Sequence, residues 1–267
     1  MMIHNATIPC KLVLAFILLT VCNAKASEKN WRKQTYQTYI HTDFSSWPQI
    51  IEDTQKQAKA ENSLPLHLEA LKDFYGYVGH LLDTKQTDKA EDWAEKATDY
   101  VEDVKDSYPD QADVLAYESM FISFKIAISP YKAPFYVSSM LKTSNEALEI
   151  APESLAALVS KANILYYFPS VFGGDKQQAL QLYLKAFAYY KQNPSVRKED
   201  WRYLFLLTTI ANAYDAVGNV TTALEWANRA LTTEPEFRYA KEGLMPKLKS
   251  RQTVTKQHET SAVSTPY

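Results

Sequence analysis

The chain has 267 residues, of which 29 are Lys or Arg and 31 are Asp or Glu, so its formal net charge is −2. No basic patch with interleaved aromatic residues stands out along it, which argues against a nucleic-acid-binding protein. Only 6 residues are glycine, and apolar residues recur at three- and four-residue spacings almost everywhere after Pro48. We therefore predict an all-α fold.

The first 26 residues are typical of a secretory signal peptide. Lys11 precedes an apolar run at residues 12–22, and Ala24-Lys25-Ala26 forms a cleavage motif. The apolar run is too short to span a bilayer, which takes roughly 20 residues. We expect cleavage after this motif and an exported, periplasmic protein. The alternative is an envelope lipoprotein anchored through Cys22, although Val21 fits poorly before a lipidated cysteine. Only in that case do we expect contact with a membrane.

The same segment holds both cysteines, Cys10 and Cys22. A mature chain without it has neither a disulfide nor a thiolate, so its stability must come from packing. Residues 1–26 contain Lys11 and Lys25 and no acidic residue, which leaves the remainder with a net charge of −4. Its charges are mixed along the chain, as is typical of solvated helix faces.

Proline marks most of the predicted helix boundaries. Pro48 and Pro65 fall in first turns, where the missing N–H group costs nothing, and Pro130, Pro152 and Pro169 follow helix ends. The predicted helices cover residues 46–61, 63–83, 87–107, 110–129, 134–150, 153–168, 175–192, 198–216, 220–233 and 236–250.

Four segments follow from these boundaries. Residues 1–26 are the signal peptide, and residues 27–62 form an N-terminal segment and the first helix. Residues 63–250 form a helical repeat domain. Residues 251–267 are polar and lack periodicity, so we predict a disordered tail there.

The strongest repeat signal lies between residues 204 and 235. Tyr214, Gly218, Ala223, Ala230 and Pro235 occupy the offsets at which a 34-residue helix–turn–helix repeat places an aromatic residue, a turn, two small contacts and a stop. Three degenerate copies begin near Leu71, Phe121 and Leu155. Because one such hairpin cannot bury its own apolar face, the pattern indicates a stacked array.

On these residues the chain resembles the tetratricopeptide-repeat (TPR) family from about Leu71 to Ser250. The resemblance implies a right-handed stack of antiparallel helical hairpins that binds a protein or peptide. The segments 129–135 and 172–175 are also similar to a group of exported bacterial repeat proteins. A weaker similarity to the helical periplasmic T-components of TRAP-type transporters implies the alternative, a small-ligand-binding component of a transport system.

In repeats of this kind, fixed positions of each first helix line a concave face. The resemblance places there Lys72, Tyr75, Gly79, Lys125, Ser129, Lys132, Asn163, Tyr166, Thr208, Asn212 and Asp215. Asn163 and Asn212 share one repeat position, and an amide there can pair with the backbone of an extended peptide. A clamp for a terminal carboxylate is not supported, since Val159 and Thr208 replace the basic residues. The alternative reading is a solvated polar face.

The loop at residues 169–175 interrupts one hairpin. Gly173 and Gly174 permit positive φ and a close backbone approach, and Asp175 is expected to cap the next helix, which opposes a bound anion. We expect Phe172 to plug the following hairpin, and Gly218 to serve as the turn residue of the last one.

No catalytic chemistry emerges from the sequence. The histidines are not spaced as metal ligands, and no nucleophile motif occurs. We therefore expect no cofactor and no enzyme. We expect an exported scaffold that binds another protein or a peptide, with the small-ligand component as the alternative.

Overall fold

The computed structural model describes residues 31–263, with side chains as far as Val254. Every regular element in that range is a helix, which confirms the predicted all-α class. The predicted signal peptide, with Cys10 and Cys22, lies outside the described residues. None of the described helices is both long and apolar enough to cross a lipid bilayer.

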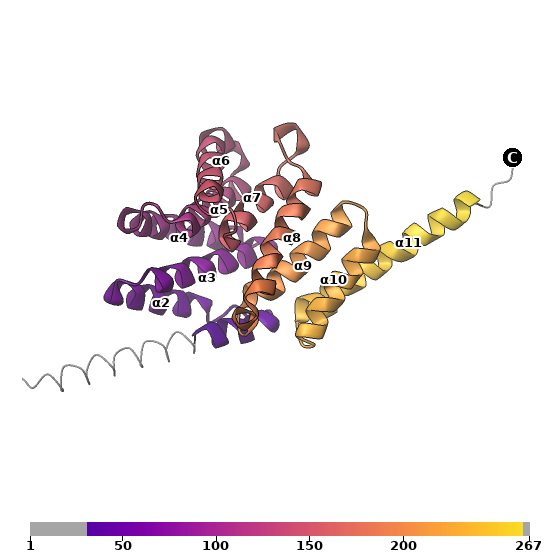
Figure 1. Cartoon of the computed structure of the whole chain (residues 1–267), viewed down its shortest axis with the longest axis horizontal. Coiled ribbons are helices and arrows are strands. Elements are labelled where there is room, and N and C mark those ends of the chain that lie inside the picture. Colours follow the sequence, from indigo (N-terminus) through magenta and orange to yellow (C-terminus); the bar gives the residue numbers. More distant parts are fainter. Residues whose placement is uncertain (1–30, 264–267) are drawn as a thin grey trace, which may run out of the picture.

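The helices follow one another in hairpins, as Figure 1 shows. A helix at residues 31–40, which the sequence did not predict, comes first. The others are α2 (Trp47–Glu61), α3 (Leu64–Asp83), α4 (Thr87–Ser107), α5 (Ala112–Ile128), α6 (Ala133–Ile150), α7 (Leu155–Tyr167), α8 (Lys176–Gln192), α9 (Trp201–Ala216), α10 (Val220–Thr233) and α11 (Met245–Val263). Short 3-10 turns lie at η1 (Pro130–Lys132), η2 (Ser170–Phe172) and η3 (Pro194–Arg197), and a π-helical turn at η4 (Tyr239–Leu244).

Side-chain caps fix several of the helix starts. Ser154 accepts a hydrogen bond from the N–H group of Ala157 at 3.1 Å, and Asn219 accepts one from Thr222 at 3.1 Å. Each cap satisfies a donor that the first turn leaves unpaired. The sequence therefore sets the boundaries of these helices locally, before any packing is considered.

Alanine lets the paired helices approach one another. Ala223 and Ala230, predicted as small contacts, are buried, and so are alanines of α4, α6, α7 and α8: Ala90, Ala94, Ala97, Ala147, Ala162, Ala179 and Ala186. α3 contacts α5, and α5 contacts α7, while α6 packs mainly on α5, α8 mainly on α7, and α4 about equally on α3 and α5. The result is the stacked solenoid that the repeat pattern predicted, with α3, α5, α7 and α9 as its inner helices.

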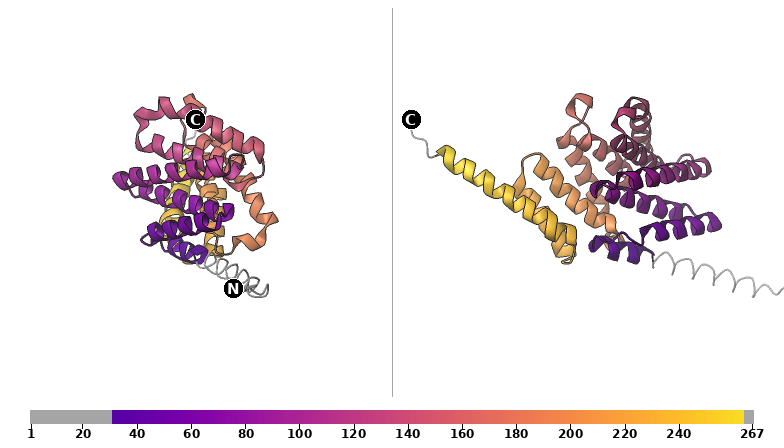
Figure 2. Two further views of the ribbon diagram at one scale, coloured as in Figure 1. Left: turned by 90° about the vertical axis from the view of Figure 1, so that its left-hand side faces the viewer. Right: turned by 180° about the vertical axis from the view of Figure 1, so that it is seen from behind.

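The two ends of the stack meet. Tyr39, from the helix at residues 31–40, lies 5.2 Å from the ring of Trp201 in α9 and 5.4 Å from that of Phe237, which follows α10. The hydroxyl of Tyr36 donates a hydrogen bond to Glu234 at 3.2 Å. Figures 1 and 2 show this indigo helix beside the orange elements near the other end of the chain. The unpredicted first helix therefore closes the inner side of the solenoid.

Two buried tryptophans form the centre of this closure. The rings of Trp47 in α2 and Trp201 in α9 lie 5.6 Å apart, and both are almost fully buried. They rest on Gly76 in α3, where an added Cβ atom would lie 2.7 Å from Trp47 and 2.9 Å from Trp201. Because no other residue leaves that space, a helix-interior glycine is required here despite its low helix propensity.

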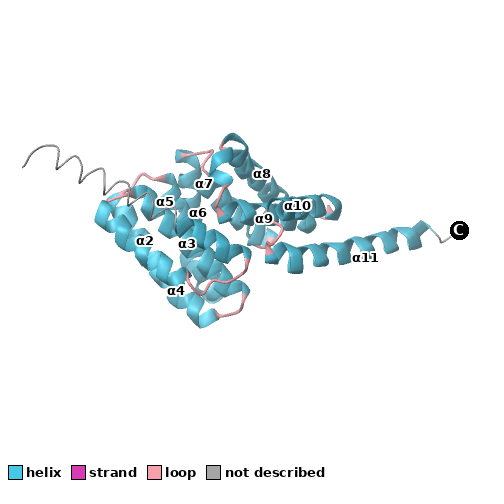
Figure 3. Ribbon diagram, turned by 90° about the horizontal axis from the view of Figure 1, so that it is seen from below, coloured by secondary structure: helices cyan, strands magenta, loops and turns pink. Residues whose placement is uncertain are grey.

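The C-terminal end differs from the prediction. Residues 251–263, predicted to be disordered, continue α11, which extends away from the body in Figures 1 and 3. Leu244 and Leu248 pack on alanines of α9 and α10, and Arg251 donates to Asp215 at 2.7 Å, so the helix begins on a firm base. No glycine or proline follows before Pro266, and nothing in the sequence therefore stops it earlier.

Candidate functional site

Two of the predicted inner-face residues, Tyr75 and Asn163, are bonded to each other. The Asn163 amide donates to the Tyr75 hydroxyl at 2.9 Å, and the Tyr183 hydroxyl donates to the Asn163 carbonyl oxygen at 2.7 Å. Burial, with nearby Tyr167, raises the pKa of Tyr75. The Asn163 amide thus ties α3, α7 and α8 together, and both of its ends are already occupied by the protein's own tyrosines.

Asn212, at the matching position of α9, has a looser environment. Its amide donates to the hydroxyl of Tyr239 at 3.2 Å, and Lys247 reaches its carbonyl oxygen at 3.4 Å. The hydroxyl of Tyr166 donates to its backbone oxygen at 3.4 Å. Tyr239 is exposed and opens the π-helical turn, a rare element found frequently at functional sites. The two asparagines are therefore not equivalent.

Tyr167 is the most accessible residue of this region. It exposes 74% of its surface, and its ring stands perpendicular to that of Tyr166 at 4.9 Å. Its neighbour Tyr166 is half-buried, so the Tyr167 ring stays open to water beside a ring that packs against the protein.

We call Tyr75, Tyr166, Tyr167, Tyr183 and Tyr239 the tyrosine cluster. The structure joins four of the predicted site residues, Tyr75, Asn163, Tyr166 and Asn212, in this one region. The sequence analysis did not single out Tyr167 or Tyr239 as binding residues. Tyr167 adjoins a predicted site position, whereas Tyr239 comes from the π-helical turn, for which the repeat template has no position.

The remaining predicted residues lie elsewhere. Asp215 is buried, pairs with Arg251 at 2.7 Å and Lys247 at 3.5 Å, and serves to hold α11. Lys125 at the end of α5 lies 5.8 Å from the ring of Tyr136 in α6. Ser129 follows α5 as its C-cap residue, and its N–H group donates to the Lys125 carbonyl oxygen.

Lys72, also predicted on the concave face, is buried in an ionic cluster that the sequence analysis missed. It pairs with Glu69, which also binds Arg32 of the first helix, and lies 3.5 Å from Asp73. The indole N–H group of Trp201 donates to Asp73 at 3.0 Å. The cluster therefore connects the N-terminal helix and α3 to α9.

A second ion pair extends this cluster at the start of α9. Asp200 caps the helix by accepting from the N–H group of Arg202 at 3.0 Å, and the Arg202 guanidinium binds the same carboxylate through two nitrogens. The Tyr190 hydroxyl donates to Asp200 at 3.0 Å. Three carboxylates, including Glu69 and Asp73, thus face three cations, so the buried group is balanced in charge.

The pKa values of Glu69 and Asp200 follow from the cations beside them. Burial opposes ionisation of Glu69, but the charges of Lys72 and Arg32 outweigh it and lower its pKa. In the same way Arg202 outweighs burial and lowers the pKa of Asp200. Groups held ionised inside a protein stabilise it only as a complete set, because a lone buried charge is costly. The complete cluster therefore stabilises the packing of the helix at residues 31–40 and α3 against α9.

The loop that holds the η2 turn has the geometry expected of its glycines. Gly173 has φ of 87°, and a Cβ atom on Gly174 would lie 1.8 Å from the carbonyl oxygen of Phe168. Asp175 caps α8 by accepting from Gln178 at 2.9 Å, and Gly218 turns between α9 and α10 with φ of 86°. Phe172, however, does not plug a hairpin, since it lies exposed at the tip of the loop.

Within residues 31–254, no three His, Cys, Asp or Glu side chains lie close enough together to hold a metal ion. The described part of the site offers hydroxyls, amides and aromatic rings. Such groups recognise a surface by contact and hydrogen bonding.

Comparison with known proteins identifies the fold. No family model matches the sequence, and no curated protein does. Among solved structures, the chain is similar to TTC0263, a thermophilic TPR protein of Thermus thermophilus, with a TM-score of 0.50 and 14% identity over 85% of this chain and 97% of that one. The predicted resemblance to TPR proteins is thereby confirmed at the level of the fold.

Two further solved structures align more loosely. MamA gives a TM-score of 0.35 at 13% identity over 80% of this chain and 96% of its own. BtubC from P. vanneervenii gives 0.36 at 13% identity over 86% and 94%.

Proposed function

We propose that the protein is an exported scaffold of the bacterial envelope that binds another protein, or an extended segment of one, at the tyrosine cluster. The observation that carries the proposal is the exposure of Tyr167 beside four other tyrosines, which come from α3, α7, α8 and η4. Tyrosine is favoured at binding surfaces, because a rigid ring with a polar end gives much contact for little lost conformational entropy. The TPR fold supports the same reading by analogy.

The hydrogen bonds support a smaller set of contact residues. Asn163 and Tyr75 are committed to bonds within the protein, whereas Tyr167 and Tyr239 are exposed and Asn212 has only long hydrogen bonds. We therefore place the contact with the partner at Tyr167, Tyr239 and Asn212.

Site-specific photocrosslinking in intact cells tests this assignment. A photoreactive residue replaces Tyr167, and a control places it at Gln181, which is exposed on the outer helix α8. We expect one dominant protein adduct from position 167 and none of the same mass from position 181. Equal labelling from both positions, or no protein adduct from 167, would contradict the proposal. A small molecule found instead in native mass spectra would favour the ligand-binding alternative.

Export has its own test, independent of the partner. We expect the periplasmic fraction to contain a chain whose mass corresponds to cleavage after Ala26. A chain that keeps residues 1–26 and fractionates with the cytosol would refute this part. An added diacylglyceryl mass on Cys22 would show the lipoprotein alternative.

A further inference from the structure

Four large apolar side chains stand exposed at one end of the molecule. Tyr131 exposes 76% of its surface, Phe135 81%, Val171 82% and Phe172 73%. Tyr131 lies in η1 and Phe135 in the first turn of α6, while Val171 and Phe172 lie in η2. These two places point to the same end of the molecule in Figures 1 and 2. We call these four residues the crest. Clustered exposed apolar side chains of this size mark an interaction surface more often than chance.

The crest is built on a firm support. Below it, Ile122, Met140 and Ile164 form a small buried core, against which Tyr136 and Phe168 from the two turns pack. The loop after Phe168 is further fixed by the close approach of Gly174 and by a hydrogen bond from Asp175 to the carbonyl oxygen of Leu165 at 2.8 Å. These contacts fix both turns in place, and the crest side chains therefore remain exposed to solvent.

The two chain segments that carry the crest have charges of one sign only. Between Glu118 and Glu146 the chain has three lysines, Lys125, Lys132 and Lys142, and no acidic residue. Between Glu153 and Asp175 it has one lysine, Lys161, and again no acidic residue. Asp175 itself is used as the cap of α8. On a chain whose net charge is −2, the two segments that carry the crest are thus basic.

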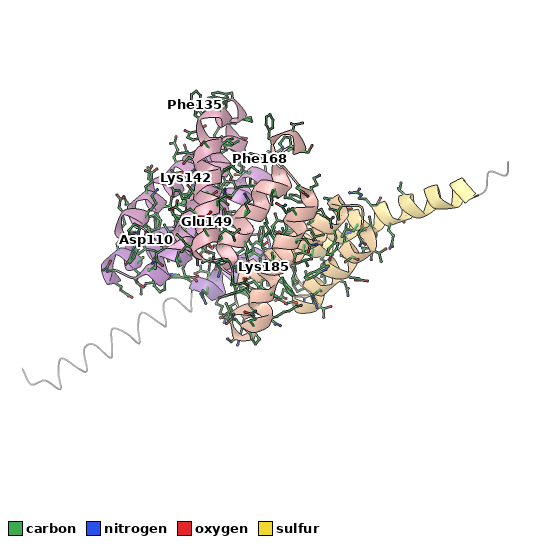
Figure 4. The ribbon with its side chains drawn as sticks, turned by 45° about the horizontal axis from the view of Figure 1, so that its top comes forward. Asp110, Phe135, Lys142, Glu149, Phe168 and Lys185 are labelled. Atoms are coloured by element: carbon green, nitrogen blue, oxygen red, sulfur yellow. The ribbon has the colours of Figure 1, made fainter. Side chains whose placement is uncertain are left out.

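The same gradient runs down a single helix. Figure 4 labels Phe135 at the outer tip of α6, Lys142 further along it and Glu149 further still. The helix therefore passes from apolar to basic to acidic with distance from the crest. This order matches the layers of an anionic membrane surface, in which hydrocarbon lies below negatively charged headgroups.

From this arrangement we infer that the crest docks the protein on the surface of an anionic lipid bilayer. The tips of Phe135, Val171 and Phe172 would enter the boundary of the hydrocarbon, with Tyr131 at the level of the headgroups, where amphipathic rings are favoured. The lysines would contact the lipid phosphates, each contributing roughly a fivefold gain in binding near such a surface. Separate protruding side chains can each insert into a fluid lipid bilayer, whereas a protein partner would need a pocket for each of them. The docking needs neither a spanning helix nor an acyl chain on Cys22.

Vesicle co-sedimentation tests the inference directly. The purified protein, with its mass verified to exclude an acyl group, is mixed with vesicles of phosphatidylethanolamine and phosphatidylglycerol, and separately with vesicles of phosphatidylcholine. We expect binding to the anionic vesicles that weakens as salt is raised, and at least tenfold weaker binding to the neutral ones. Absence of binding to anionic vesicles at low salt would overturn the inference.

Variants locate the contact. Replacing Phe135 and Phe172 together with Ser should reduce binding at least tenfold, while the melting temperature stays within a few degrees because both side chains are exposed. The matched control is Ile150→Ser, an exposed apolar residue at the opposite end of α6, which should bind as the unaltered protein does. Equal binding by the double variant would refute the crest as the contact. Capture of a protein by a photocrosslinker at position 135, without vesicle binding, would show a protein-docking surface instead.

Discussion

The packing of the two tryptophans that close the solenoid can be tested by adding one methyl group at Gly76. Replacing Gly76 with Ala adds a Cβ that would lie 2.7 Å from the ring of Trp47 and 2.9 Å from that of Trp201. Neither ring can move freely, because both are buried and the Trp201 indole N–H group is bonded to Asp73. Overpacking of this kind costs about 1 to 3 kcal/mol, against a gain of about 1 kcal/mol from the better helix propensity of alanine.

The matched control lies one turn further along the same helix. A Cβ on Gly79 would meet its nearest atom, in Phe124, at 3.9 Å, so Gly79→Ala gains the helix propensity without a clash. The two variants should therefore differ by the overpacking cost alone. In thermal unfolding followed by circular dichroism, we expect Gly76→Ala to melt roughly 2 to 12 °C below Gly79→Ala. Equal melting temperatures would mean that the two tryptophans do not pack on α3 as described.

Two further predictions concern the buried polar groups. Glu69→Gln removes the carboxylate that pairs with both Lys72 and Arg32, leaves Lys72 only the more distant Asp73, and should cost about 3 to 5 kcal/mol in urea unfolding. The folded pKa of Glu69 is lowered, so the stability that its carboxylate contributes is fully present above the ordinary pKa of 4.5 and is lost as the pH falls below it. Glu69→Gln has no such carboxylate and should therefore lose less stability than the unaltered protein below about pH 4.5. Asn163→Ala leaves two tyrosine hydroxyls unpaired, and urea unfolding should show a loss of about 1 to 3 kcal/mol; an unchanged midpoint would contradict the hydrogen bonds that we describe.

The fold could be predicted because its determinants are local. Alanines at repeat spacing, prolines in first turns and capping residues act within one or two turns of the chain, and each is readable without knowing what packs against it. Most predicted helix boundaries agree with the structure to within a few residues, and α10, predicted at residues 220–233, agrees at both ends.

The closure could not be predicted because its determinants are far apart in the chain. Tyr39 and Trp201 meet only after all the intervening hairpins have stacked, and their spacing follows no repeat. The helix at residues 31–40 was missed since its polar sequence, rich in Thr and Gln, buries few apolar residues of its own. Two charges among the apolar residues of α3, Lys72 and Asp73, could have indicated a buried ionic cluster. The repeat template assigns positions by spacing alone, and it placed Lys72 on an open face.

The same closure determines where the candidate binding surfaces lie. An open repeat array offers its concave side to a partner, yet here that side is largely occupied by Trp47, Trp201 and the ionic cluster. What stays exposed is the edge of the inner face at Tyr167 and the crest beyond it. Phe172 follows Tyr167 by five residues across a turn that Gly174 holds in place. A partner bound at Tyr167 would therefore lie next to any surface that the crest contacts, so that binding and docking would act on neighbouring parts of one rigid unit.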